Sequence, residues 1–363
     1  MQRIDLSEDA NLDYVNGSEN GDTSVVNVIN NASFTEWYRE RERVENIQAG
    51  RSYFNGPPSQ PDANRHRPSL LMRCHRYAYY KRRNAPKESA SPDGLFWFGS
   101  KFEEEVIVPF LQDVSTDHLF VRNSVWTNST IDVETVELVL KGMTDPVLVT
   151  DDGEPVLVTE IKTSSSVEYR TEPAEHHKAQ IHSYLYGLRD QYERDIPGVI
   201  VYISRDTLDL KAFRVDFDAD FWDEVVAWMA TQTEYEQRDE LPPPSPRQDW
   251  ECKYCDYKNR CGKGSEPFQD LGTEGLLTLY EYPKEAVKEY LQSHDDGLLT
   301  PTMAHLYPEL AREFDVADWA CPSCSTRLHW KSIDWDGETD SPPMCPDCLQ
   351  QDNLTALRGE QTY

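Results

Sequence analysis

The spacing of the eight cysteines constrains this chain more than any other feature of its sequence. They form two sets of four: a lone cysteine followed much later by three clustered ones, and two Cys-x-x-Cys pairs. Such pairs in a cytosolic chain are more often metal ligands than disulfides. We therefore expect two four-thiolate metal sites. The staple cysteines are Cys74, Cys252, Cys255 and Cys261, and the ribbon cysteines are Cys321, Cys324, Cys345 and Cys348.

The charge balance limits the surroundings in which such a chain works. It has 65 Asp and Glu against 36 Lys and Arg, a formal net charge of −29. Acidic chains usually avoid polyanions, so an ordinary acidic protein without a nucleic-acid substrate is one interpretation. We favour adaptation to a halophile cytosol at molar salt, where charges are screened within roughly 3 Å. The polar N-terminus and the lack of a long apolar run predict a cytoplasmic protein without membrane contact.

Hydrophobic periodicity predicts an α/β fold between the staple cysteines. Helices are expected over residues 69–83, with Ser69 as N-cap, and over 97–113, 173–193 and 221–238. Strands are expected over 136–142, 155–163, 198–204 and 210–217, and residues 151–154 suit a hairpin turn. This order of elements indicates a mixed sheet flanked by helices.

The candidate catalytic residues lie on the predicted hairpin. Asp145 precedes one arm, while Glu160 and Lys162 lie two residues apart on the other and so share one face of the strand. Carboxylate oxygens suit Mg²⁺ or Mn²⁺, which can polarise a phosphate and generate hydroxide. A Glu-x-Lys pair alone is more often a solvated charge pair. On the next helix, Gln180 and Tyr184 are four residues apart and share a face.

The series Asp, Glu-x-Lys, Gln-x-x-x-Tyr resembles the motifs of RecB-like PD-(D/E)XK nucleases, such as the CRISPR-associated iron–sulfur exonucleases and the AddB nuclease domain. The resemblance covers roughly residues 67–262 and implies a restriction-endonuclease-like fold. It implies metal ligation by Asp145 and Glu160, a catalytic Lys162, and supporting roles for Gln180 and Tyr184. The family often has a histidine on its first helix. Here Glu103 stands at that position, and the choice between Glu103 and Glu104 as metal ligand stays open.

The two cysteine sets predict different metals. The one-plus-three array of staple cysteines resembles the 4Fe-4S site of the same nucleases, and a structural zinc site is the alternative. The ribbon cysteines resemble a zinc ribbon that binds Zn²⁺ through two knuckles. A small tail domain that the metal holds folded is the simpler interpretation of the ribbon, and a docking module for DNA or protein is the other.

One stretch of this acidic chain has no acidic residue. Between Asp62 and Glu88 it holds eight cations and several aromatic residues, and we call this stretch the basic island. Cations follow a phosphate backbone and aromatic rings stack on unpaired bases, although the cations could also only balance acidic neighbours. The predicted nucleic-acid contacts are Arg73, Arg76, Lys81, Arg82 and Arg83.

The expected organisation has four parts: a polar arm (1–62), a nuclease domain (63–263), a helical connector (264–318) and a zinc ribbon (319–363). The expected activity is that of a metal-dependent DNA nuclease, with exonuclease action in CRISPR spacer acquisition or recombinational repair. The expected partners are single-stranded DNA or duplex ends, with CRISPR integration proteins or a helicase. The alternative is a non-catalytic DNA-binding or adaptor protein that keeps the nuclease fold.

Overall fold

The computed structural model describes residues 29–48, 60–89, 93–116, 118–134, 136–264, 270, 272–339 and 341–359. The chain divides into two compact units, Met1–Gly56 and Pro57–Tyr363. In the first unit, the helix α2 (Asn31–Gln48) is an ordered element that the predicted polar arm did not include. None of the described helices is long and apolar enough to cross a membrane.

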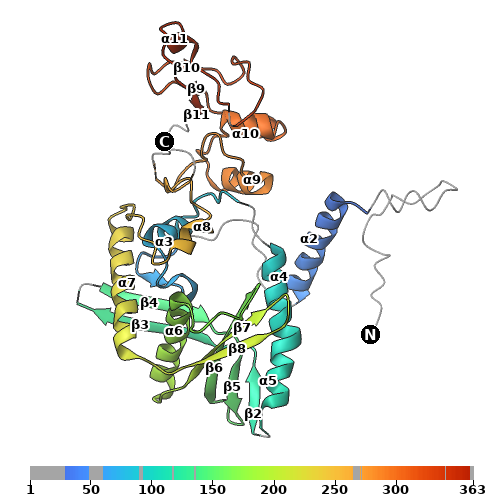
Figure 1. Cartoon of the computed structure of the whole chain (residues 1–363), viewed down its shortest axis with the longest axis vertical. Coiled ribbons are helices and arrows are strands. Elements are labelled where there is room, and N and C mark those ends of the chain that lie inside the picture. The colour runs from blue at the N-terminus through green and yellow to red at the C-terminus, as the bar shows by residue number, and fades with distance from the viewer. Residues whose placement is uncertain are drawn as a thin grey trace, which may run out of the picture. The chain divides into compact units, whose positions relative to one another are not determined.

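The second unit is built on a five-stranded sheet with the order β2-β5-β6-β7-β8 (Figure 1). Its central strands β6 (Pro155–Ser164) and β7 (Gly198–Ser204) run parallel. They are joined through α6 (Glu175–Tyr192), as a parallel pair requires. The other pairs are antiparallel. The remaining strands of this sheet are β2 (Leu119–Arg122), β5 (Val147–Thr150) and β8 (Leu210–Val215).

Helices cover both faces of this sheet. Ile181 and Leu185 of α6 share a buried core with Val158 and Ile200 of the central strands. On the other face, a helical segment packs Phe102 against the sheet through a second core. That segment consists of α4 (Asp93–Phe102), the π-helical turn η2 (Glu103–Ile107) and α5 (Val108–Val114). The predicted mixed sheet flanked by helices is confirmed.

A second sheet has the order β1-β4-β3. Its strands are β1 (Arg65–His66), β3 (Trp126–Val133) and β4 (Val136–Met143). The helix α7 (Ala219–Gln237) packs Val225 and Met229 against Leu138 and Leu140 of β4. The strands over 136–142 and 155–163, and the helices over 173–193 and 221–238, lie where the sequence predicts them.

The helix predicted over residues 69–83 is wrong in its first half. The backbone of Met72 is left-handed, with φ of 57°, a conformation that interrupts a helix of L-residues. The segment is therefore a short 3₁₀ turn, η1 (Pro68–Leu70), followed by α3 (His75–Arg82). Cys74 is the residue directly before α3, and Ser69 does not cap it.

The C-terminal region has two small cores. The first surrounds α9 (Lys284–Ser293), α10 (Pro301–Leu306) and the turn η3 (Leu310–Arg312). The second is the ribbon, whose sheet β10-β9-β11 joins Arg327–Leu328, Trp319–Ala320 and Arg358–Gly359. Its short helix α11 (Pro346–Leu349) carries Cys348. Within the predicted helical connector (264–318), residues 285–292 lie in α9, whereas residues 308–314 form only the turn η3.

Candidate active site and metal centres

The β5–β6 hairpin places Asp145 beside the strand that carries Glu160 and Lys162. The hairpin turns at Gly153, whose φ of +79° suits a residue without a side chain. The backbone N–H of Ile161 donates to the Asp145 carboxylate at 2.6 Å. Since Ile161 lies between Glu160 and Lys162, this bond fixes Asp145 at the edge of their shared face.

Glu160 is the most deeply buried carboxylate of the site: its side chain is 0% exposed, and among the described residues no donor other than Lys162 reaches its oxygens. It forms an ion pair with Lys162. Burial, followed by the charge of Asp145, raises the pKa of Glu160 to about 8. Burial alone would lower the pKa of Lys162, but the charges of Glu160 and Asp145 outweigh it and raise that pKa. Lys162 therefore stays a cation.

The π-helical turn η2 brings Glu103 to the same place. Burial, followed by the charge of Asp145, raises the pKa of Glu103 to about 7. Glu104 instead pairs with Lys101 at 3.0 Å, and its side chain is 62% exposed. Of the two candidates, Glu103 is therefore the one whose carboxylate interacts with the hairpin. Turns of the π type often occur at functional sites.

Gln180 and Tyr184 lie on α6 over the sheet face that Glu160 occupies. The Gln180 side-chain amide donates to the Tyr184 hydroxyl at 3.2 Å, and both side chains are buried. Burial, followed by the charge of Glu160, raises the pKa of Tyr184. The structure therefore brings together the predicted residues of the hairpin and the following helix.

The donor set fits a divalent cation. A fully buried carboxylate whose one partner is an ammonium group is costly to keep ionised, and a cation between Glu160 and Asp145 would lower that cost. Oxygen ligands suit Mg²⁺ and Mn²⁺. Across the described residues, the oxygens of Glu103, Asp145 and Glu160 do not all lie within 4.8 Å of one another, a spacing that only the ribbon cysteines meet. A cation would have to draw the three closer.

Two residues beside this site were missed by the sequence analysis. Tyr202 of β7 pairs in register with Lys162 of β6. Its hydroxyl accepts from the Ala174 N–H at 3.0 Å and lies 2.8 Å from Nδ1 of His177. The adjacent histidines at the start of the predicted helix over 173–193 were the only signal for this contact in the sequence.

We expect cation binding at this site to release protons and to strengthen with pH. The metal-free pKa values of about 7 for Glu103 and about 8 for Glu160 mean that both are largely protonated at pH 6. A cation binds only the ionised forms, so Mn²⁺ affinity should rise from pH 6 to 9. Calorimetric Mn²⁺ titrations in two buffers of different protonation enthalpy measure the released protons. Glu160→Gln should reduce the release, and binding independent of pH would contradict this assignment.

The staple cysteines line one pocket, although they come from distant segments. Cys74 directly precedes α3, and Cys252 lies in the short helix α8 (Asp249–Lys253), with Cys255 and Cys261 after it. Glu251 ties the segments together by accepting from the backbone N–H of Cys74 at 3.0 Å. Burial raises the pKa of Cys255 to about 12. A bound metal would be needed to hold that sulfur as thiolate.

The two cysteine sets differ in spacing. The Sγ atoms of Cys321 and Cys348 are 3.6 Å apart, as are those of Cys324 and Cys345. A tetrahedral zinc with Zn–S bonds of about 2.3 Å places its sulfurs about 3.8 Å apart. The ribbon cysteines meet this spacing, whereas no three staple cysteines have sulfurs all within 4.8 Å. The wider set suits a larger metal group.

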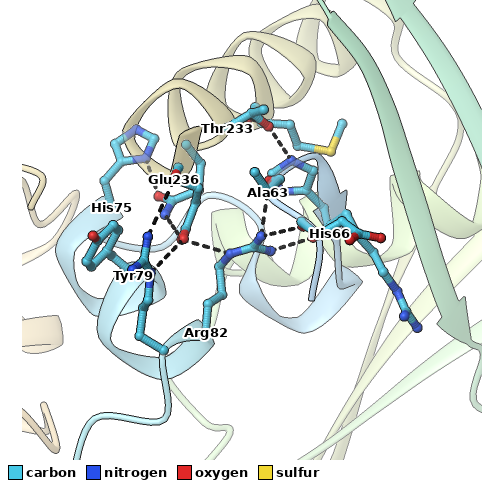
Figure 2. A network of polar contacts seen from close by, with 12 residues as sticks. Ala63, His66, His75, Tyr79, Arg82, Thr233 and Glu236 are labelled. Carbon is cyan, nitrogen blue, oxygen red and sulfur yellow. Dashed lines mark hydrogen bonds and ion pairs between the residues drawn. The ribbon is translucent and has the colours of Figure 1, made fainter. Parts of the chain in front are cut away.

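Two cations of the basic island, Arg82 and Arg83, form ion pairs within the protein. Figure 2 shows Arg82 of α3 reaching toward Glu236 of α7, with the two side chains 2.8 Å apart. The Arg82 guanidinium also donates to the backbone oxygens of Asp62 and Ala63 at 3.0 and 3.1 Å. Arg82 is buried, so the expectation that it is a surface DNA contact is at odds with its position. Arg83 is likewise paired with Glu236 at 3.3 Å.

The other predicted cations have different surroundings. Arg76 donates to the backbone oxygen of Pro242 at 2.6 Å and pairs with Asp270 at 3.5 Å. Lys81 is exposed, and its ammonium lies 5.7 Å from the centre of the Tyr77 ring. Arg73 lies over two aromatic rings and pairs with Glu251 at 3.7 Å, and its side chain is 20% exposed. Lys81 is therefore the best-placed member of the predicted set.

The fold and the site define a class of protein. Its members have a mixed α/β sheet, and the carboxylates and lysine on the hairpin of that sheet can act with a divalent cation on a phosphodiester bond. The chain belongs to the PD-(D/E)XK nuclease superfamily, whose family model matches residues 60–262. This match confirms the resemblance that the Asp, Glu-x-Lys and Gln-x-x-x-Tyr motifs indicated.

Individual proteins are similar over parts of the chain. The CRISPR-associated exonuclease Cas4 of Saccharolobus solfataricus is 30% identical over 122 residues, 34% of this chain and 52% of that protein. The chain thus spans about half the length of this curated relative. The crystal structure of SSO0001 is 23% identical, with 65% and 98% of the two chains covered and a TM-score of 0.43. An alkaline exonuclease from Laribacter hongkongensis is 14% identical, with 49% and 93% covered and a TM-score of 0.30.

Proposed function

We propose that this protein is a Mg²⁺- or Mn²⁺-dependent DNA nuclease that degrades DNA from an end. The observation that carries the proposal is Glu160, a fully buried carboxylate beside Asp145 whose one partner among the described residues is the Lys162 ammonium. A stable fold gains nothing from such a group, and perturbed carboxylates of this kind gather at functional sites. Membership of a nuclease superfamily supports the same reading.

In this proposal each side chain has one task. Asp145, Glu160 and Glu103 hold the cation, which when bound polarises the scissile phosphate and acidifies water. The Lys162 ammonium, kept protonated by its carboxylate neighbours, orients the attacking water or stabilises charge on the phosphate oxygens. Gln180 and Tyr184 support Glu160 from the α6 side. Tyr202 flanks Lys162 from the next strand.

The proposed role is DNA end processing in the cytoplasm. The Saccharolobus relative is a CRISPR-associated exonuclease, which favours spacer acquisition together with CRISPR integration proteins. Recombinational repair beside a helicase is the second setting in which such an end-processing nuclease acts. Both settings supply single-stranded DNA or duplex ends.

The central experiment incubates anaerobically purified protein with labelled single- and double-stranded DNA, in high KCl, with Mn²⁺, Mg²⁺ or EDTA. We expect cleavage with either cation and none with EDTA. Products that shorten progressively from one end would support exonuclease action. Folded, metal-loaded protein that leaves both DNAs intact would contradict the proposal.

We also propose that the staple cysteines hold a 4Fe-4S cluster and the ribbon cysteines hold one zinc. The wider sulfur spacing around the staple pocket supports the first assignment. Anaerobic protein should then be brown and contain about four iron, about four sulfide and about one zinc per chain. Elemental analysis and a sulfide assay measure these contents. Two zincs and no iron would reject the cluster and leave the nuclease proposal standing.

The proposed division of the chain keeps the boundaries expected from the sequence: nuclease domain 63–263, connector 264–318 and ribbon 319–363. The separate core around Leu291 and Met303 supports the connector. A further core, which includes Trp319 and Leu357, supports the ribbon.

A further inference from the structure

An open groove of about 470 Å³ lies at the start of α6. This volume is within the range of ~300–1,000 Å³ typical of small-ligand sites. The residues that line it include Arg170, His176, Lys178, Arg247 and Trp250. The helix α6 begins here without a side-chain cap, and the first N–H groups of a helix favour an anion. The groove thus offers several features that suit a phosphate chain.

A row of aromatic and cationic side chains crosses this groove. From the staple pocket, Arg73 lies 4.8 Å from the ring of Tyr77 and 5.5 Å from that of Trp250. The Trp250 ring is 5.4 Å from His176, which touches His177. The row ends at Tyr202, the register partner of Lys162, with Arg170 4.0 Å from its ring. It therefore joins the staple pocket to the candidate active site.

Two cations that line the groove have no carboxylate partner among the described residues. The Arg170 guanidinium lies 4.0 Å from the centre of the Tyr202 ring, and the Lys178 ammonium lies 4.6 Å from the centre of the Phe221 ring. The other cations face acids, since Glu175 pairs with Arg247 at 2.6 Å and Glu251 lies 3.7 Å from Arg73. Arg170 and Lys178 are thus the cations that remain available to a phosphate.

We propose that this groove is the track of a single DNA strand on its way to the hairpin carboxylates, with Trp250 stacking on an unpaired base. The phosphates would lie along Arg170 and Lys178. Trp250 is 39% exposed, so one part of its ring is available although Arg73 and His176 contact it. This inference rests on the proposed nuclease function and adds a strand preference to it.

A single strand fits these features better than a duplex. Every unpaired base has a free face for an aromatic ring, and each such stack contributes about 1–3 kcal/mol. In a duplex the base faces are already stacked, so Trp250 would have no partner there. The protein should therefore distinguish the two forms of DNA through this one side chain.

The test measures binding of fluorescein-labelled oligo(dT) to full-length protein by anisotropy, with Ca²⁺ replacing Mg²⁺ to prevent cleavage. Trp250→Ala should weaken binding about tenfold, as the loss of one stack of about 1.4 kcal/mol implies. Trp250→Phe should retain most of the affinity. The matched control is Tyr254→Ala, which removes a ring that is 71% exposed, four residues away and outside the groove lining. It should bind like the parent.

A blunt duplex of mixed sequence is the second ligand, and Trp250→Ala should change its affinity less than twofold. Unchanged oligo(dT) affinity in folded Trp250→Ala, equal losses for both DNAs, or no oligo(dT) binding by the parent would each overturn the track. Hydrolysis of the p-nitrophenyl ester of thymidine 5′-monophosphate by the parent tests the catalytic site alone. A parent that binds oligo(dT) through Trp250 but cleaves neither DNA nor this ester would keep the track and reject the nuclease.

Discussion

Replacing Lys162 with alanine is expected to slow DNA cleavage a hundredfold or more while the protein still binds Mn²⁺. Among the described residues, the Lys162 ammonium is the cation that pairs with Glu160. The charges of Glu160 and Asp145 raise the pKa of Lys162 and so keep it protonated. Loss of a group that stabilises transition-state charge typically costs 10²–10³ in rate. Single-turnover cleavage of labelled DNA, at matched iron content, measures the loss.

The same site should behave as one unit. Asp145→Ala and Glu160→Ala each remove a proposed ligand, so a double variant should be little worse than the poorer single one. Lys141→Ala is a matched control, because Lys141 lies on β4 in the other sheet, and it should cleave like the parent. If Lys162→Ala cleaved DNA at the parental rate, the activity would come from elsewhere. The non-catalytic adaptor would then be the better account of this fold.

Replacing Cys345 with serine is expected to unfold the ribbon while the nuclease domain remains folded. Cys321, Cys345 and Cys348 are themselves a large part of the ribbon core, packed with Trp319 and Leu357. So small a core cannot stabilise itself without its metal, and structural zinc contributes about 10–16 kcal/mol in zinc-finger peptides. The loss of zinc should therefore cost the ribbon its whole stability.

Trp319 reports this unfolding, since it is 0% exposed in the folded ribbon and its emission should shift to the red. Limited proteolysis should cut after residue 319, and zinc analysis should find the metal gone. Ser323→Ala changes the residue beside Cys324 without removing a thiol and serves as the control. A Cys345→Ser protein that keeps its zinc and its buried tryptophan would contradict the assignment of a four-thiolate site.

The sequence predicted the centre of this fold well because the centre follows simple periodicity. Glu160 and Lys162 are two residues apart on β6 and so share one face, and the turn at Gly153 is marked by its residue types. Gln180 and Tyr184 are four apart on a helix, and the structure joins them through a hydrogen bond. These relations are local, so their spacing alone indicates them.

The remaining features depend on long-range packing that no local pattern encodes. The left-handed backbone of Met72 splits a segment that reads as one helix. Arg82 looked like a surface cation, but α7 buries it against Glu236, 154 residues later in the chain. Glu103 is selected over Glu104 by the π-helical turn. These outcomes depend on local backbone conformation or on a distant element, and hydrophobic periodicity encodes neither.

The long reach of these contacts has a consequence for synthesis on the ribosome. Cys74 meets Glu251 across 177 residues and Arg82 meets Glu236 across 154. At about 5–20 residues per second, the first partners wait roughly 8–35 s for the second to be made. During that interval the basic segment of the nascent chain has neither its acidic partners nor its three later thiols. The nuclease can therefore close, and accept its metal group, only after translation has passed residue 261.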